Sequence, residues 1–195
     1  MNQNFITCGG YDSDEGVTDK CYLLESEEPF ATMMTKRRNA ASIVLDEKLL
    51  ILEGSSRSIV LEPGKLWILG GSDENNNILS STEYIFADGK NEEGPPMPIA
   101  LDRHVMVKIN GTTSLLVGGW MGNSANNQKS WYYNDKWHIG PNLPKARNGH
   151  SVGIVRDSVT NQDYLVVAGG YDGSYLNDVE ILSVTGTAWE PGNLL

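Results

Sequence analysis

A pair of adjacent glycines recurs four times along this chain of 195 residues, each time directly after a short apolar run. The first glycines of the pairs stand at positions 9, 70, 118 and 169, which gives intervals of 61, 48 and 51 residues. Self-similarity at a period near 50 residues indicates a repeat protein, in which each unit buries its apolar face against a neighbouring unit.

Other features recur in phase with the glycine pairs. About a dozen residues after each pair comes a second β-prone run, at residues 20–23, 82–85, 131–133 and 179–182. A further aromatic residue follows in three repeats, at Phe30, Trp137 and Trp189. Short runs of this kind, bounded by Gly, Pro, Asn and Asp and without a helical period between them, predict an all-β fold.

A Pro-rich turn then leads into each next repeat. Residues 143–151 align with residues 34–42 and with residues 97–104. This alignment matches Arg147 with Arg38 and places His150 and His104 at one shared position.

In this order (glycine pair, Tyr strand, Trp, then an Arg and His turn) the residues resemble the kelch repeat over nearly the whole chain. The resemblance implies a β-propeller of kelch-type, four-stranded antiparallel blades. We expect about four blades, the first of them incomplete because it lacks its innermost strand. The expected repeats span approximately residues 1–37, 38–101, 102–147 and 148–195.

The long first interval coincides with an internal duplication. Residues 42–55 are closely matched by residues 58–72, so one strand–turn–strand hairpin near 42–72 is present twice. We interpret the extra copy either as an added hairpin at one blade's edge or as an error in splicing or in the gene model. With so few blades, three interpretations stay open: a fragment, a small closed propeller, or a propeller completed by a second chain.

The two cysteines, Cys8 and Cys21, stand in one predicted hairpin. Cys8 precedes the glycine pair, and we place Cys21 at the Glu position of the neighbouring strand. Antiparallel neighbours can bring two Cβ atoms within bridging reach, so we predict a disulfide, with two buried thiols as the alternative. A bridge would indicate an extracellular protein, and its absence a cytoplasmic one.

Asn110-Gly111-Thr112 matches a glycosylation sequon. Because Asn-Gly also favours tight hairpin turns, we interpret this segment as a turn.

Composition argues against several functions. The formal net charge is −10, whereas nucleic-acid surfaces need clustered Lys and Arg. No apolar run approaches the roughly 18 residues of a membrane span. The chain has neither a phosphate-binding glycine loop nor a Gly-x-Ser-x-Gly elbow, and His104 and His150 read as turn residues rather than metal ligands. We therefore expect no catalytic site, no metal and no cofactor.

The kelch resemblance implies instead that a protein or peptide partner binds at the propeller rim. Family members that bind peptides use the residue after the glycine pair and the residues one or two places after the Arg. Transferred to this chain, the expected contacts are Tyr11, Ser72, Trp120 and Tyr171, with Asn39, Asp102, Arg103 and Asn148. Met121, Asp172 and Tyr175 would extend this surface.

Three of the four residues after the glycine pairs are aromatic, and Tyr, Trp and Arg most often dominate interface energy. We therefore predict a protein-interaction module, as in a scaffold or an adaptor. The alternatives are a propeller enzyme, either sugar-acting or a copper-dependent oxidase, and a non-functional kelch fragment.

Overall fold

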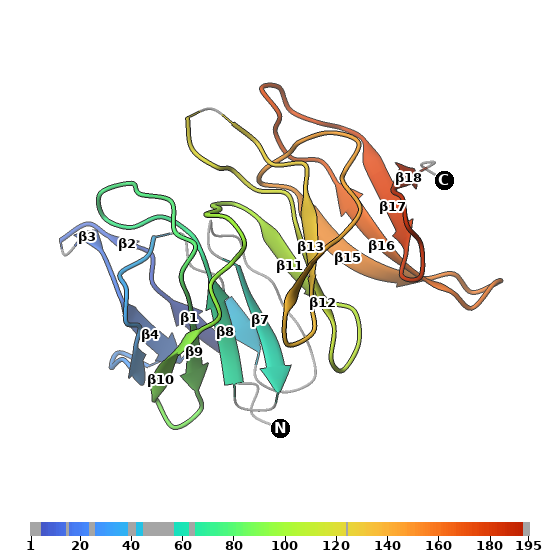
Figure 1. Cartoon of the computed structure of the whole chain (residues 1–195). Coiled ribbons are helices and arrows are strands. Elements are labelled where there is room, and N and C mark those ends of the chain that lie inside the picture. The colour runs from blue at the N-terminus through green and yellow to red at the C-terminus, as the bar shows by residue number, and fades with distance from the viewer. Residues whose placement is uncertain are drawn as a thin grey trace. The chain divides into compact units, whose positions relative to one another are not determined.

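The computed structural model describes residues 5–14, 16–23, 26–38, 42–44, 57–62, 65–123 and 125–192. All regular structure in these segments is β, and no helix occurs among them. Four antiparallel sheets of four strands each account for most of it (Figure 1). This is the all-β architecture of kelch blades that the repeats predict, and the sheets are called blades 1 to 4 below.

Blades 2 to 4 are each built from four strands in chain order. Blade 2 consists of β7 (Arg57–Glu62), β8 (Lys65–Leu69), β9 (Thr82–Phe86) and β10 (Asn91–Gly94). Blade 3 consists of β11 (Val105–Lys108), β12 (Ser114–Val117), β13 (Ser130–Tyr133) and β14 (Trp137–Ile139). Blade 4 consists of β15 (Ser151–Arg156), β16 (Asp163–Ala168), β17 (Val179–Ser183) and β18 (Glu190–Pro191).

Blade 1 has four strands but breaks the chain order. It is formed by β1 (Phe5–Cys8), β4 (Lys20–Leu23), β5 (Ala31–Thr32) and β6 (Ser42–Val44), in the order β5-β4-β1-β6. The edge that β7, β11 and β15 occupy in the other blades is therefore filled by β6, which follows the rest of the blade in sequence. The expectation of an incomplete first blade is corrected on this point. A separate two-stranded ribbon pairs β2 (Tyr11–Asp12) with β3 (Gly16–Val17).

The duplicated hairpin is divided between two blades. Its second copy forms the β7–β8 hairpin of blade 2, with a register irregularity between Val60 and Glu62. The first copy contributes β6 to blade 1, where Ile43 lies opposite Ile6 of β1. Residues 45–55, which complete the first copy, lie outside the described residues.

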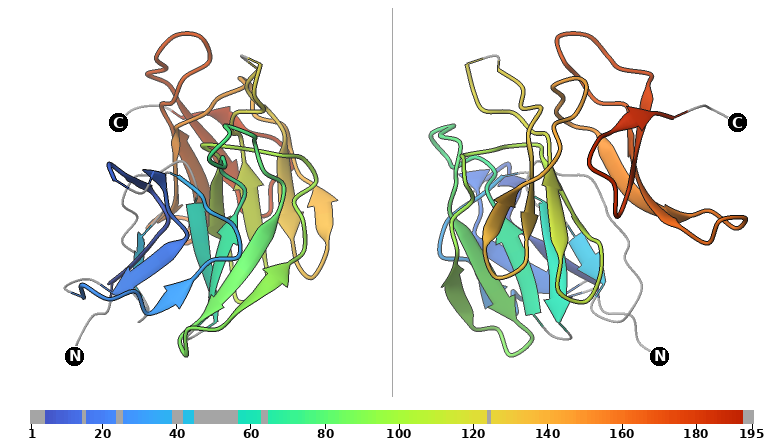
Figure 2. Two further views of the ribbon diagram at one scale, coloured as in Figure 1. Left: turned by 90° about the vertical axis from the view of Figure 1, so that its left-hand side faces the viewer. Right: turned by 45° about the vertical axis from the view of Figure 1, so that its right-hand side comes forward.

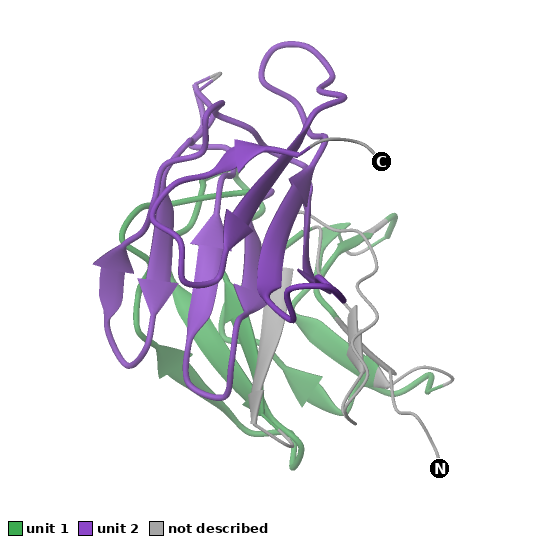
Figure 3. Ribbon diagram, turned by 90° about the vertical axis from the view of Figure 1, so that its right-hand side faces the viewer, with its two compact units in different colours: residues 1–102 green, residues 103–195 purple. Residues whose placement is uncertain are grey.

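The chain divides into two compact units, residues 1–102 and 103–195 (Figure 3). Each unit has an apolar core of its own. The core of the first unit contains Cys8, Cys21, Ala31, Met33, Leu66, Ile68 and Ile85. The core of the second contains Val105, Leu115, Val117, Leu143, Val152, Leu165, Val167, Leu182 and Trp189.

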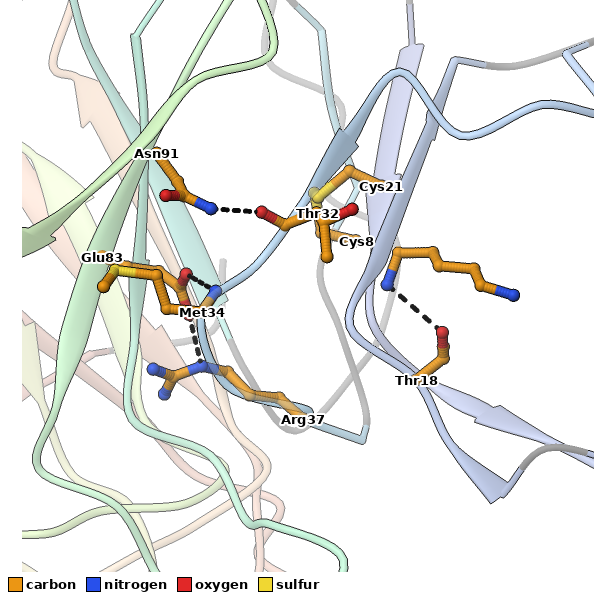
Figure 4. The surroundings of a disulfide bond; sticks show 9 residues. Cys8, Thr18, Cys21, Thr32, Met34, Arg37, Glu83 and Asn91 are labelled. Carbon is orange, nitrogen blue, oxygen red and sulfur yellow. Dashed lines mark hydrogen bonds and ion pairs between the residues drawn. A yellow bond between two sulfur atoms is a disulfide. The ribbon is translucent and has the colours of Figure 1, made fainter.

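A buried ion pair joins the two blades of the first unit. Arg37 Nε lies 3.1 Å from Glu83 Oε1, and both side chains are 1% exposed. Glu83 Oε2 also accepts a hydrogen bond from the Met34 amide at 2.6 Å (Figure 4). Burial lowers the pKa of the Arg37 guanidinium, and the adjacent Glu83 carboxylate partly opposes that shift.

The second unit has an equivalent buried arginine. Arg147, 0% exposed, contacts Asp178 Oδ1 at 2.9 Å and Glu180 Oε1 at 3.7 Å. Glu180 occupies the position in blade 4 that Glu83 occupies in blade 2, because each lies opposite the second residue before its glycine pair.

The cysteines of blade 1 face each other directly. Cys8 of β1 is the register partner of Cys21 of β4, with a Cα–Cα distance of 4.0 Å, and the two are joined by a disulfide (Figure 4). This register corrects one detail of the sequence alignment. Cys21 corresponds to Thr82, Ser130 and Val179 in the other blades, and Tyr22 takes the Glu position of blade 1.

The described residues form no helix that has both the length and the apolar character needed to span a membrane.

Candidate binding surface

The glycine pairs turn the chain out of each blade toward the loops. All eight of these glycines have positive φ, between 56° and 119°, which side chains with a Cβ rarely adopt. At Gly118 a second constraint applies, since a Cβ there would lie 2.5 Å from His150 Cε1 and 2.7 Å from the Arg147 carbonyl oxygen. The buried His150 therefore packs against the glycine backbone of the same unit. Among the described residues no group of three His, Cys, Asp or Glu side chains could hold a metal ion.

The amide of the second glycine identifies equivalent turn positions in three repeats. The Gly10 amide donates to the Arg37 carbonyl oxygen at 2.7 Å, and the Gly71 amide donates to the Leu101 carbonyl oxygen at 3.0 Å. In the third repeat Gly119 donates to Arg147 at 2.8 Å. Arg37, not Arg38, is thus the equivalent of Arg147, and the sequence alignment is one residue out of register in the first repeat.

The positions after the glycine pairs and the positions after the Arg lie side by side in the structure. An antiparallel bridge joins Arg38 to Ser72 in the first unit, and an equivalent bridge joins Asn148 to Tyr171 in the second. Each bridge links the residue after the Arg position of one blade to the residue after the glycine pair of the next blade. Arg38, which the shifted alignment missed, joins this set one place after Arg37, and Asn39 stands two places after it in sequence.

In the first unit most of the residues predicted to contact a partner are either buried or lie outside the described residues. Ser72 is 2% exposed and its Oγ accepts a hydrogen bond from Arg38 Nε at 3.3 Å, while Arg38 Nη2 donates to Asn76. Asp102 is 3% exposed, so neither it nor Ser72 presents its side chain to a partner. Tyr11 is 72% exposed on the β2–β3 ribbon. Asn39 lies outside the described residues.

In the second unit two loops are closed by short-range pairing. Residues 120–123 and 125–126 belong to one loop, in which Trp120 bridges to Asn126 and the Met121 amide donates to the Ala125 carbonyl at 2.9 Å. Residues 171–175 form the next loop, in which Tyr171 bridges to Tyr175. Both loops extend from the glycine-pair ends of their blades (Figure 2).

Asn148 ties these loops together. Its backbone exchanges two hydrogen bonds with Tyr171, at 3.1 and 2.9 Å. Its Nδ2 donates to Asn126 Oδ1 at 2.6 Å, and Asn126 Nδ2 donates to the Tyr171 carbonyl at 3.0 Å. Because Asn148 is only 5% exposed, it holds the loops in place rather than offering a contact of its own. The role of Asn126 could not be predicted from the sequence, because the loops after the glycine pairs differ in length and do not align.

We give the name loop cluster to five side chains, four from these loops and one from the turn before β11: Trp120, which is half-buried, and Met121, Tyr171, Tyr175 and Arg103, which are exposed. The Tyr171 and Tyr175 rings lie edge to face with centroids 5.5 Å apart, and the two side chains are 42% and 91% exposed. Met121 is 42% exposed. The Arg103 guanidinium carbon lies 5.7 Å from the centre of the Trp120 ring, within the range of a cation–π interaction. The cluster offers large apolar faces and one cation.

Residues 146–193 match the family model of the kelch motif. The chain thus contains a kelch repeat, as the sequence predicts. The matched segment contains blade 4 with the buried Arg147, His150, the last glycine pair and Trp189. No match to the chain was found among curated proteins. The kelch motif is commonly a protein-interaction module, and the family is generally non-enzymatic.

Proposed function

We propose that this protein binds a protein or peptide partner through the loop cluster of its second unit and is not an enzyme. The observations that carry the proposal are the exposed Tyr171–Tyr175 pair on one loop and the half-buried Trp120 beside the exposed Arg103 on the loop that Asn126 ties to it. Exposed Tyr, Trp and Arg side chains are the residue types that most often dominate binding energy between proteins.

The arrangement also lowers the cost of binding. The hydrogen bonds of Asn148 and Asn126 fix the backbone of both loops before a partner arrives. Loops that are ordered in advance lose less conformational entropy on association, so more of the contact energy contributes to affinity. The net charge of −10 disfavours a nucleic-acid partner and favours one that is neutral or basic.

The test uses a peptide probe selected from a phage-displayed random library against the folded full-length protein. We expect Trp120→Ala, Tyr171→Ala or Tyr175→Ala each to weaken binding of the probe about tenfold or more, because central aromatic anchors contribute at least 1–2 kcal/mol. Isothermal titration calorimetry measures the affinity, and urea unfolding verifies that each variant is folded.

Val159→Ala is the matched control. Val159 is 90% exposed in the turn between β15 and β16, at the opposite end of blade 4 from Tyr171, so its truncation removes exposed apolar surface away from the cluster. Selected peptides that bind all three aromatic variants as tightly as the wild type would refute the proposal.

A further inference from the structure

The sequon Asn110-Gly111-Thr112 lies in a fully exposed turn. All three residues are exposed in the segment that connects β11 to β12. The Ile109 amide donates to the Thr113 carbonyl at 2.8 Å, which closes the turn and confirms the interpretation of Asn-Gly as a hairpin signal. A Cβ at Gly111 would meet no atom within 4 Å, so the turn is open to a large group.

The turn brings the Thr112 hydroxyl within hydrogen-bonding distance of the Asn110 side-chain amide oxygen. Asn110 Oδ1 accepts three hydrogen bonds: from the Thr112 amide at 3.0 Å, from Thr112 Oγ1 at 3.2 Å and from the Thr113 amide at 2.9 Å. Donors on the carbonyl oxygen stabilise the negative charge that develops there when Nδ2 gives up a proton, and so make this weakly nucleophilic nitrogen more reactive.

The disulfide is an independent observation about the environment in which the chain folds. Cys8 and Cys21 are bridged, and both are buried, at 2% and 0% exposure. Disulfides persist in oxidising compartments such as the secretory route, where the transfer of glycans to asparagine also takes place.

We propose that Asn110 of this protein carries an N-linked glycan. In the transfer, a bond forms between Asn110 Nδ2 and C1 of the first sugar of a lipid-diphosphate-linked oligosaccharide. The bond between C1 and the diphosphate oxygen breaks, the lipid diphosphate leaves with the electron pair, and one Nδ2 proton is released. The donor is the only co-reactant, and no oxidation or reduction is involved.

The position of Asn110 is compatible with the proposed binding function but does not depend on it. Strand β12 begins at Ser114, next to the sequon turn, and ends at Val117, next to the glycine pair that precedes the Trp120 loop. The turn and the Trp120 loop therefore lie at opposite ends of blade 3 (Figure 2). A glycan at Asn110 would leave the loop cluster uncovered.

The decisive experiment examines the protein isolated from the cells that make it. Trypsin releases residues 109–129, in which Asn110 is the only sequon asparagine. Digestion with a peptide N-glycosidase in ¹⁸O water converts a glycosylated asparagine to ¹⁸O-labelled aspartate, which mass spectrometry locates. We expect the label at position 110 only in the sample treated with the glycosidase, because spontaneous deamidation of Asn110-Gly111 would label an untreated sample as well. Unmodified Asn110 in the native protein would overturn the proposal, whatever the state of the cysteines.

Three variants secreted from eukaryotic cells test the role of the hydroxyl. We expect Thr112→Ala and Asn110→Gln to lose the glycan and Thr112→Ser to keep it. Urea unfolding checks that each variant is folded, because Asn110 also holds the turn. A glycan retained in Thr112→Ala would overturn the assignment. We expect unglycosylated Asn110→Gln to bind the peptide probe with unchanged affinity. The binding proposal and the glycosylation proposal can therefore fail independently of each other.

Discussion

At the residue scale, the repeat is held together by buried charges that are paired. The Arg position holds Arg37 and Arg147 in two repeats, and the Glu position of the following blade holds Glu83 and Glu180. The second repeat has Leu101 at the Arg position, and the third repeat has Trp131 at the Glu position. An arginine buried at the Arg position without any acidic partner would be costly, because an unpaired buried charge destabilises a fold by about 3–5 kcal/mol.

The two carboxylates around Arg147 are expected to respond to pH in opposite ways. For Asp178, burial acts to raise the pKa, but hydrogen bonds from Lys145 and Arg147 outweigh it and hold the pKa below its usual 3.8. Its stabilising contribution is therefore present above about pH 4 and is lost as the pH falls through the lowered value. For Glu180, burial dominates and raises the pKa above 4.5. The charged form of Glu180 then costs stability as the pH rises through that value.

We predict that Asp178→Asn lowers the free energy of unfolding at pH 7 by about 1–3 kcal/mol, since Arg147 loses a charged hydrogen-bond partner. Urea unfolding at a series of pH values should show this deficit vanish as the pH falls through the lowered pKa of Asp178. Glu180→Gln is the matched control, because it removes a group whose ionised form is unfavourable. It should gain on the wild type between pH 4.5 and neutrality. An Asp178→Asn deficit that stays constant with pH would contradict the assigned role.

Residue positions were predictable from sequence where the repeat is regular. The glycine pairs and the buried His150 stand where the motif places them, because positive φ and close backbone approach admit few residue types. The shift of one residue in the first turn has a simple cause: Met33-Met34 and Arg37-Arg38 are doubled, so two alignments match equally well. The hydrogen bond from Gly10 to the Arg37 carbonyl and the buried ion pair of Arg37 with Glu83 distinguish them.

At the element scale, strand identity was more predictable than strand partnership. The apolar runs before the glycine pairs and the second β-prone runs all form strands, because both are local features of composition. The use of β6 to complete blade 1 could not be foreseen. Its residues repeat those of β7, and the choice between pairing with β1 or with β8 depends on contacts distant in sequence.

The disulfide yields a prediction about blade 1 itself. It joins β1 to β4 across 13 residues of chain, and a crosslink that closes a loop of this size stabilises a fold by about 3 kcal/mol. We expect Cys8→Ala/Cys21→Ala to lower the free energy of unfolding by about that amount. Urea unfolding with and without a thiol reductant measures it, since the unfolded chain exposes the buried bridge to reduction.

The reductant is also the control. It should lower the wild-type midpoint to that of the double variant and leave the variant's midpoint unchanged. A wild type that unfolds identically with and without reductant would mean that the cysteines are not bridged in solution.

At the scale of the whole molecule, the loop residues determine what the protein can bind, and they were the hardest to predict. The kelch motif gave the positions after the glycine pairs, yet two of the four differ sharply in exposure: Ser72 is buried and Tyr11 is open to solvent. Loop length and the neighbouring blade decide such outcomes, and neither is encoded in the motif. The exposed aromatics of the second unit therefore emerge only from the folded chain.

The net charge of the whole chain determines whether copies of the protein associate with one another. With a formal charge of −10 at pH 7, copies of this protein repel one another, and we expect light scattering to report a monomer of 21.4 kDa in low salt. Near pH 4.7, where the net charge vanishes, this repulsion is lost and the exposed tyrosines, Met121 and Val159 favour association.

Light scattering of unglycosylated protein across pH 4 to 8 should therefore show a maximum of apparent mass near pH 4.7. Urea unfolding at the same pH values is the control that separates association of folded molecules from acid unfolding. A stable dimer at pH 7 in low salt would contradict the prediction, and it would mean that an apolar face overcomes the charge. A monomer at pH 7 would leave the loop cluster free of self-association, the state in which its affinity for a partner is correctly measured.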